Sequence, residues 1–394
     1  MDQYKEKILN VLPAIRMIMS DQTTKVAIFV PLSQLQVTDP AELSARIGRS
    51  VSVFKNRSSD EIIQEVIKMR KDIGEYLFIE EMGLIGIGVN KSKIEQKLIV
   101  IRKSRGDREL PESVPVPQIK KTIYNKIVMI TGGAQGFGEG IARNLFKLGA
   151  NIIIGDINEE GGMALVKDLN AHKTPNRALF VKMDVTDPAS VDAAVTEVIF
   201  EYGGMDLMIS NAGILRAGSL EEMDPDEFMM VTRVNYTGFF HCTRSASRVM
   251  KVQNRYGTDH YSDIIQINSK SGLQGSKKNF AYAGGKFGGI GLVQSFALEL
   301  IPDRIKVNAI CPGNYFEGPL WSDPDNGLFV QYLKAGKVPG AKTIADVKKH
   351  YESMVPAGRG CKPADVVKAI LYVIDQEYET GQAIPVTGGQ VMLR

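Results

Sequence analysis

Tyr282 and Lys286 are the two residues whose types and spacing are best suited to acid–base chemistry. A separation of four residues on a helix puts both side chains on one face, one turn apart. A lysine ammonium in that place favours the phenolate and lowers the tyrosine pKa toward the range of a general base. Ser269, thirteen residues upstream of Tyr282, would hold a substrate oxygen while Tyr282 gives or takes its proton. The spacing is common on helices, so its meaning depends on the surrounding sequence.

The segment around residues 126–138 predicts a phosphate-binding turn. An apolar, β-branched run at residues 126–130 predicts a buried parallel strand, and a helix is expected over residues 139–148. Between them stands Thr131-Gly-Gly-Ala-Gln-Gly-Phe-Gly138. A strand, a glycine turn and a helix let the backbone approach a pyrophosphate, whose charge the helix N-terminus stabilises. The alternative is a tight turn without a ligand.

The next predicted strand, at residues 151–156, ends in Asp156. It stands about twenty residues past the glycine turn, where a carboxylate accepts hydrogen bonds from the ribose hydroxyls of a dinucleotide. A carboxylate there repels a 2′-phosphate, and neither the glycine turn nor residues 157–160 contain a lysine or an arginine. We therefore expect the cofactor to be NAD. The alternative is that Asp156 only forms a turn.

Composition limits the class of protein. The chain has 394 residues and a formal net charge of +3, which indicates neither a nucleic acid nor a membrane as partner. Its three scattered cysteines, Cys242, Cys311 and Cys361, indicate reduced thiols. We see no secretory segment and no apolar run that could span a bilayer. We expect a cytoplasmic protein that acts on a small molecule and uses no metal.

A charged, then proline-rich segment divides the chain. We expect a small α/β N-terminal domain over residues 1–103, a linker over residues 104–123 and a catalytic domain over residues 124–394. In the first domain, strands are expected at residues 26–30, 76–79 and 84–89, the last two paired around the turn at 80–83, and an amphipathic helix at 60–73. Residues 92–101 fit a helix or a strand. Downstream, alternating strands and helices predict a Rossmann-type, doubly wound parallel sheet.

From residue 126 to the C-terminus the sequence resembles the short-chain dehydrogenase/reductase family. The resemblance rests on seven motifs in the family's order: Thr131-Gly-Gly-Ala-Gln-Gly-Phe-Gly138, Asp184-Val185, Asn211-Ala-Gly213, Asn235, Ser269, Tyr282-x-x-x-Lys286 and Asn308-Ala-Ile-Cys-Pro-Gly313. It implies that the catalytic residues are Asn235, Ser269, Tyr282 and Lys286. It also implies a homo-oligomer, a tetramer or a dimer, built through the helices around Asn235 and Tyr282.

The same resemblance implies the residues that contact NAD. Asp184 would contact the adenine, Asn235 would hold a helix bend and a relay water, and Lys286 would also bind the nicotinamide ribose. The implied set is Thr131, Gly132, Gln135, Gly136, Phe137, Gly138, Asp156, Asp184, Val185, Asn211, Ala212, Gly213, Tyr282, Lys286, Pro312 and Gly313. Many members place a threonine after the Pro-Gly pair to hold the carboxamide, but this chain has Asn314-Tyr-Phe-Glu-Gly-Pro. The group that holds the carboxamide is therefore unassigned.

A narrower resemblance, to the sorbitol-6-phosphate 2-dehydrogenase family, concerns the substrate. It rests on residues 264–272, 275–277, 286–289 and 387–392. Members use NAD to interconvert sorbitol 6-phosphate and fructose 6-phosphate. A phosphate dianion requires basic residues, and four lie near the predicted site: Lys270, Lys277, Lys278 and Arg216. The alternative is a solvated basic loop.

Predictions can also be made for two further segments. Residues 316–349, rich in Gly, Pro and Asp and containing the sole tryptophan, Trp321, are expected to form a substrate lid. Residues 84–91 are faintly similar to the class II sugar-phosphate aldolase family, whose zinc site needs histidines. Residues 1–120 contain no His and no Cys, so we expect no zinc site there and a role in assembly or regulation.

Two alternatives to this function are open. One is a short-chain dehydrogenase that acts on another polyol or ketone. The other is a non-catalytic NAD-binding regulator with the N-terminal domain as its output, although the complete set of Ser269, Tyr282 and Lys286 argues against it.

Overall fold

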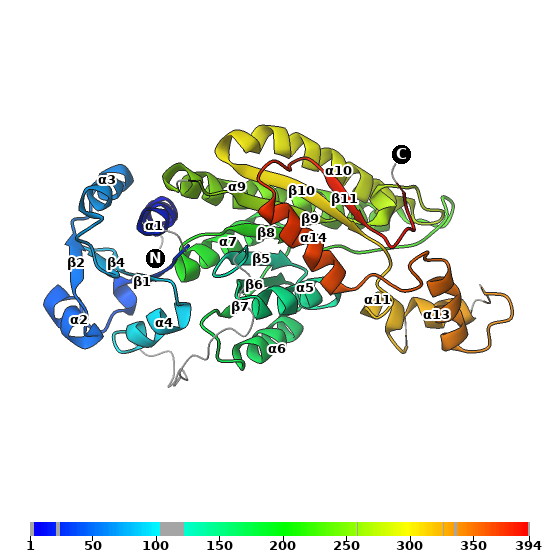
Figure 1. The fold of residues 1–394 in the computed structure, drawn as a ribbon, viewed down its shortest axis with the longest axis horizontal. Coiled ribbons are helices and arrows are strands. Elements are labelled where there is room, and N and C mark those ends of the chain that lie inside the picture. Colours follow the sequence, from blue (N-terminus) through cyan, green and yellow to red (C-terminus); the bar gives the residue numbers. More distant parts are fainter. Residues whose placement is uncertain are drawn as a thin grey trace.

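Two β-sheets organise the chain (Figure 1). The computed structural model describes residues 4–20, 24–102, 122–257, 259–325, 327–334, 336 and 338–392. The predicted linker, residues 104–123, lies outside these ranges except for its last two residues. None of the helices in the described ranges is long and apolar enough to cross a membrane.

The larger sheet has seven parallel strands in the order β11-β10-β9-β8-β5-β6-β7. This confirms the predicted doubly wound parallel sheet. Its strands are β5 (Ile127–Thr131), β6 (Asn151–Asp156), β7 (Ala178–Lys182), β8 (Leu207–Ser210), β9 (Ser262–Ile267), β10 (Ile305–Pro312) and β11 (Ala383–Val386). The strand order reverses between β5 and β8, and ligands of such sheets bind beyond the carboxyl ends of the strands at this point.

Helices cover both faces of this sheet, and the strand alternation explains why (Figure 1). In β5, Met129 belongs to one apolar cluster while Val128 and Ile130 belong to the other. Helices α7 (Pro188–Tyr202), α9 (Gly238–Tyr256) and α10 (Phe280–Leu300) build the first cluster. Helices α5 (Gly136–Lys147), α6 (Glu159–Asn170) and α14 (Pro363–Asp375) build the second. The strands are buried on both sides, as their continuous apolar runs predict.

A short helix, α8 (Pro225–Thr232), leads into α9 through the π-helical turn η3 (Arg233–Thr237). Two 3₁₀ turns, η4 (Lys270–Gly272) and η5 (Ile301–Asp303), flank α10.

Residues 316–349 do not form the open loop that their composition suggested. They contain α11 (Pro319–Ser322), α12 (Leu328–Lys334) and the start of α13 (Ile344–Ser353). These helices share a small apolar cluster that includes Phe316, Trp321 and Phe329. Trp321 packs 4.9 Å from Phe316 and 5.1 Å from Phe329 between ring centroids. The lobe was not predicted, because its apolar residues are divided among short segments separated by Gly, Pro and Asp.

The smaller sheet, in the N-terminal unit (residues 4–20 and 24–102), has the strand order β1-β4-β3-β2. The strands are β1 (Val26–Pro31), β2 (Val51–Phe54), β3 (Tyr76–Ile79) and β4 (Gly83–Gly88), and the helices are α1 (Lys5–Met19), η2 (Leu32–Gln34), α2 (Pro40–Ile47), α3 (Ser59–Met69) and α4 (Lys91–Ile99). The antiparallel pairing of β3 with β4 confirms the predicted hairpin, and α4 resolves residues 92–101 in favour of a helix. The sequence analysis made no prediction for α1, α2 and β2.

The N-terminal unit and the larger C-terminal body (residues 122–392 as described) share one apolar core. Helix α1 packs against α9 and α7, and β1 packs against α7. The buried Lys91 of α4 donates to the carbonyl oxygen of Glu201 (2.5 Å), and Arg177 donates to the Ser92 hydroxyl (2.7 Å). The unit therefore lies against the C-terminal end of α7 and the neighbouring ends of the sheet, rather than standing apart on a tether.

Gly203, which ends α7, permits this close packing. Its φ is +82°, and a Cβ there would lie 2.6 Å from the Cβ of Ala27 in β1. Gly358 has a similar φ of +69° with nothing within 4 Å of the same position. We expect Gly203→Ala to lower the free energy of unfolding by about 1–3 kcal/mol more than Gly358→Ala, because only the first substitution overpacks the contact with β1. Chemical denaturation of the two full-length variants measures this, and equal losses would contradict the packing described.

Candidate active site

The three residues with the predicted acid–base chemistry meet at the carboxyl end of β9. Ser269 lies two residues after the end of this strand, and α10 carries Tyr282 and Lys286 on one face. The Lys286 Nζ lies 5.5 Å from the centroid of the Tyr282 ring. Lys286 is buried and donates to the carbonyl oxygen of Ile267 at 2.9 Å, so its ammonium is fixed beside the end of β9.

The pKa of Tyr282 differs from the sequence-based expectation. Burial raises the pKa of Tyr282, and a hydrogen bond with Ser269 only partly offsets this. Burial also lowers the pKa of Lys286 to about 8. The lowered tyrosine pKa that was expected from Lys286 is therefore not found in this structure, because burial raises the pKa and the Lys286 ammonium is bonded to the Ile267 carbonyl. Spacing on a helix shows which side chains are neighbours, but it does not show how far they are buried from solvent.

Asn235 occupies the π-helical turn η3 and is buried. Its amide accepts from the Ile214 N–H at 2.9 Å and donates to the Ile214 carbonyl at 2.8 Å. A Cβ on Gly213 would lie 2.9 Å from the Asn235 Oδ1 and 3.7 Å from the Lys286 Nζ. Asn235 thus ties the bend before α9 to the segment after Gly213, close to Lys286.

The glycine turn has the geometry that its sequence predicts. Gly132 and Gly136 adopt φ values of +60° and +62°, which favour glycine. A Cβ on Gly138 would lie 2.1 Å from the Gly132 carbonyl oxygen, so the turn can only close on a glycine. Helix α5 begins at Gly136, and the side chain of its N-cap residue, Gln135, makes no capping bond. The first N–H groups of α5 are therefore suited to bind an anion.

Thr131 and Asn211 connect the glycine turn to the end of β8. The Thr131 Oγ1 accepts from the N–H groups of Asn211 and Ala212, both at 3.0 Å. The Asn211 side chain donates to the carbonyl oxygens of Thr131 (3.0 Å) and Gly132 (2.9 Å). The two loops are held in one arrangement by four bonds.

The two predicted acidic residues lie at the ends of β6 and β7. Asp156 accepts from the N–H of Ala134 in the glycine turn and from the N–H of Asn158, both at 2.9 Å. Asp184 is exposed, and its Oδ1 accepts from the N–H and hydroxyl of Thr186 at 2.8 Å. Each of these carboxylate oxygens keeps a lone pair that could accept a hydrogen bond from a ligand. The contact with Ala134, which orients the glycine turn, was not predicted.

One cleft of about 890 Å³ joins these groups. The predicted residues that line it are Gly132, Gln135, Gly136, Phe137, Asp156, Asp184, Val185, Asn211, Ala212, Gly213, Arg216, Ser269, Lys270, Tyr282, Lys286, Pro312 and Gly313. Thr131, Gly138 and Asn235 do not line it and act through the loops that they hold. No group of three or more His, Cys, Asp or Glu within the described ranges is placed to hold a metal.

The basic residues predicted for a substrate phosphate separate into two pairs. Lys270 is half-buried at the cleft and Arg216 lies at its wall, 3.7 Å from Glu227. Lys277 and Lys278 are exposed and do not line the cleft, and Lys278 lies 3.8 Å from Glu222. In this structure only Lys270 and Arg216 of the four predicted phosphate contacts line the cleft.

The opposite wall of the cleft contains residues that the sequence analysis did not assign to the site. Trp321, Tyr332 and Tyr351 come from the lobe of α11 to α13, with ring centroids 5.2–5.9 Å apart. Tyr315 packs 4.8 Å from Phe137 in the glycine turn. Asn314, which stands after the Pro-Gly pair, also lines the cleft. Only Trp321 carried a signal, as the single tryptophan of the expected lid.

Comparison with known proteins agrees with this geometry. A family model described as short chain dehydrogenase matches residues 126–320. Sorbitol-6-phosphate 2-dehydrogenase of Escherichia coli K12 is 35% identical over 271 residues, which cover 68% of this chain and 99% of that protein. The crystal structure of sorbitol-6-phosphate 2-dehydrogenase from Erwinia amylovora superposes with a TM-score of 0.61 at 35% identity, over 68% of this chain and all of that one.

A structural neighbour of lower sequence identity is named for another substrate class and another cofactor. An actinorhodin polyketide ketoreductase with NADPH matches with a TM-score of 0.59 at 27% identity, over 68% of this chain and 97% of that one. The family match begins at residue 126, so the N-terminal unit lies outside it.

Proposed function

This chain belongs to the short-chain dehydrogenase family, and on that premise we propose that it uses NAD to interconvert sorbitol 6-phosphate and fructose 6-phosphate, or a close sugar-phosphate polyol. The observation that carries the proposal is the single cleft that holds Ser269, Tyr282 and Lys286 together with the glycine turn and Asp156.

The residues of the cleft fit a dinucleotide. The N-terminus of α5 would bind the pyrophosphate, Asp156 the adenosine ribose and Asp184 the adenine. The Asp156 carboxylate at the end of β6 supports NAD over NADP, although one structural neighbour holds NADPH. When bound, the nicotinamide supplies the hydride acceptor or donor. Lys286, beside Gly213, is placed to bind the nicotinamide ribose.

Tyr282 performs the proton transfer in this proposal. In the oxidation direction its phenolate takes the proton of the C2 hydroxyl, while Ser269 holds the same oxygen. The Lys286 ammonium lies 5.5 Å from the centroid of the Tyr282 ring, and Asn235 orders the backbone beside it. Because burial raises the Tyr282 pKa, the base form is scarce near neutral pH, and oxidation is favoured as the pH rises.

We expect Tyr282→Phe to lower kcat by roughly 10²- to 10⁴-fold, since it removes the general base and leaves the cleft intact. NADH binding, measured by fluorescence titration, should stay within about twofold of wild type. The wild-type oxidation rate should rise with pH, and the residual rate of the variant should lose that dependence. Near-normal turnover by Tyr282→Phe would contradict the assignment.

Lys270 is the residue best placed to bind the substrate phosphate. It is adjacent to Ser269 and half-buried at the cleft, and burial lowers its pKa. A phosphate dianion would offset that desolvation by a charge-assisted hydrogen bond. Arg216 at the cleft wall is a second contact, whereas Lys277 faces solvent.

We expect Lys270→Met to raise the KM for sorbitol 6-phosphate about 10-fold or more, with the KM for NAD unchanged. Lys277→Met is the matched control and should change neither constant by more than about twofold. Steady-state kinetics of the two variants gives the comparison. Equal effects of both substitutions would mean that the phosphate is bound elsewhere.

The helical lobe of residues 316–349 is proposed to close over the substrate, with Trp321 at the cleft wall as its reporter. We expect the Trp321 emission to change when NADH and substrate bind together, because the indole environment changes on closure. Trp321→Phe provides the background signal. An emission that does not respond to both ligands would count against a moving lobe.

A second candidate function follows from the same wall. Trp321, Tyr332 and Tyr351, with Leu320 and Leu328, present a large apolar surface that would also suit a bulkier ketone or polyol. A purely regulatory NAD-binding role is the weaker alternative, because the complete Ser269, Tyr282 and Lys286 set serves no purpose in a sensor.

We further propose a cytoplasmic homo-oligomer, a tetramer or a dimer. Its support is the exposed apolar side chains on the helices around the site, among them Phe240 of α9 and Phe287 and Leu298 of α10, which are 41%, 46% and 80% exposed. The cysteines are free and buried, as a reducing compartment would allow.

A further inference from the structure

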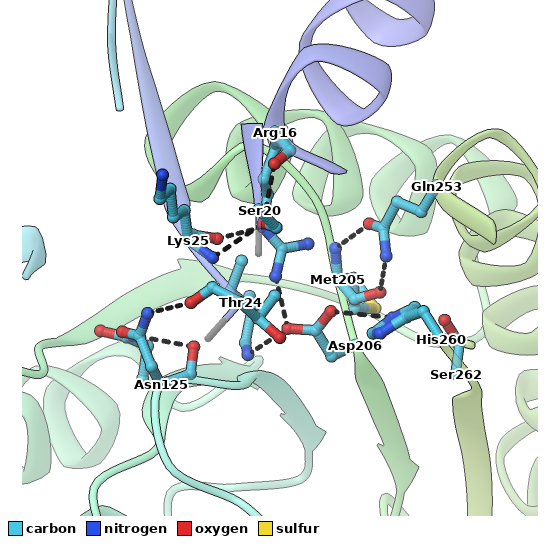
Figure 2. A network of polar contacts seen from close by, with 12 residues as sticks. Arg16, Ser20, Thr24, Lys25, Asn125, Met205, Asp206, Gln253, His260 and Ser262 are labelled. Atoms are coloured by element: carbon cyan, nitrogen blue, oxygen red, sulfur yellow. Dashed lines mark hydrogen bonds and ion pairs between the residues drawn. The ribbon is translucent and has the colours of Figure 1, made fainter. Parts of the chain in front are cut away.

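Helix α1 places a buried cation at the amino-terminal edge of the large sheet. Arg16 is 0% exposed, and its Nη2 lies 2.6 Å from the Oδ2 of Asp206. Its Nε donates to the carbonyl oxygen of Lys25 at 2.5 Å (Figure 2). Asp206 immediately precedes β8, so the N-terminal unit reaches the point where a central strand begins.

The same Asp206 oxygen also holds the start of β5. The Ile127 N–H donates to the Asp206 Oδ2 at 2.8 Å. Strands β5 and β8 are parallel neighbours, paired from Val128 with Leu207 to Ile130 with Ile209. At their carboxyl ends, the Thr131 Oγ1 accepts from the N–H groups after β8. One carboxylate and one hydroxyl thus tie the same two short strands at opposite ends.

Arg16 makes the ionised form of Asp206 stable in this buried place. Burial alone raises the pKa of Asp206, but Arg16, helped by His260 and Lys126, brings that pKa well below its ordinary value. The His260 Nε2 lies 3.4 Å from the Asp206 Oδ1 (Figure 2). Burial lowers the pKa of His260, so near neutral pH its ring does not supply the charge of the guanidinium. A buried carboxylate that loses its counter-cation must take up a proton or move.

We propose that Arg16 is a positioning residue for the dinucleotide cleft. By keeping Asp206 charged and bonded to Ile127, it fixes the strand pair whose carboxyl ends carry the glycine turn and the Asn211 segment. This gives the N-terminal unit a role in cofactor binding without contact with the cofactor. The inference depends on the proposed function in one respect, that the cleft binds a dinucleotide.

Three full-length variants distinguish a positioning role of Arg16 from a general loss of stability. Arg16→Met removes the cation. Arg16→Met with Asp206→Asn restores a neutral acceptor for the Ile127 N–H that needs no counter-cation. Lys91→Met is the matched control, since Lys91 is also a buried cation of the N-terminal unit, but it pairs with Glu95 and Glu201 (3.1 and 3.5 Å), neither of which bonds to β5 or β8 in the contacts described.

The readouts are NADH and NADPH binding by fluorescence titration, below the unfolding temperature of each variant, and hydrogen exchange of peptides over residues 127–131. We expect Arg16→Met to raise the NADH Kd about 10-fold and to speed exchange in β5. In the double variant, Arg16→Met with Asp206→Asn, the NADH Kd and the β5 exchange rate should both return to within about twofold of wild type. Lys91→Met should lower the melting temperature but leave the Kd and the β5 exchange unchanged.

Arg16→Met with wild-type affinity and wild-type exchange would overturn the inference, and so would an equal loss of affinity in Lys91→Met. If the wild-type chain binds neither NADH nor NADPH, the proposed function fails. The exchange of β5 then still decides the link between Arg16 and the strand: faster exchange in Arg16→Met alone supports it, and unchanged exchange contradicts it.

Discussion

The pairing of β5 with β8 is the constraint from which the site follows. It lies where the strand order of the large sheet reverses, so the loops after the two strands diverge and leave a crevice between them. The bonds of Thr131 and Asn211 then fix the glycine turn against the Asn211 segment. On the far side of β8, β9 delivers Ser269, and α10 returns across the sheet with Tyr282 and Lys286. The N-terminal unit contacts this pair at its other end.

Local sequence patterns were sufficient for the parts of the site that depend on local geometry. The glycine turn was predictable because its glycines stand between a strand pattern and a helix pattern. The Tyr282 and Lys286 pair was predictable because a four-residue spacing puts both side chains on one helix face, and alternating strands and helices indicated the fold class. The hairpin of residues 76–88 was predictable because its apolar runs flank a turn. In each case the residues that decide the structure are close together in the chain.

Features that depend on long-range contacts were not predictable. Nothing in the sequence around Arg16 indicates that it meets Asp206, 190 residues later. The exposure of Lys277 and Lys278 depends on how the chain folds before α10, which the charge of these residues does not indicate. The raised pKa of Tyr282 follows from its burial in the folded chain, which the spacing of Tyr282 and Lys286 does not indicate. The aromatic lobe likewise forms from side chains of three separate short helices, α11, α12 and α13. Charge and spacing indicate which side chains could take part in the chemistry of a site, but burial in the folded chain sets their contacts and their pKa values.

Oxidation of a phosphorylated polyol with NAD is the activity that we propose for this cleft. Its most direct test is the initial rate of reduced cofactor formation by the full-length protein with sorbitol 6-phosphate or sorbitol, each with NAD or NADP. We expect rapid NADH formation with sorbitol 6-phosphate and NAD, and much slower rates in the other three combinations. Equal rates with sorbitol and its phosphate, or no turnover of sorbitol 6-phosphate with either cofactor, would contradict it.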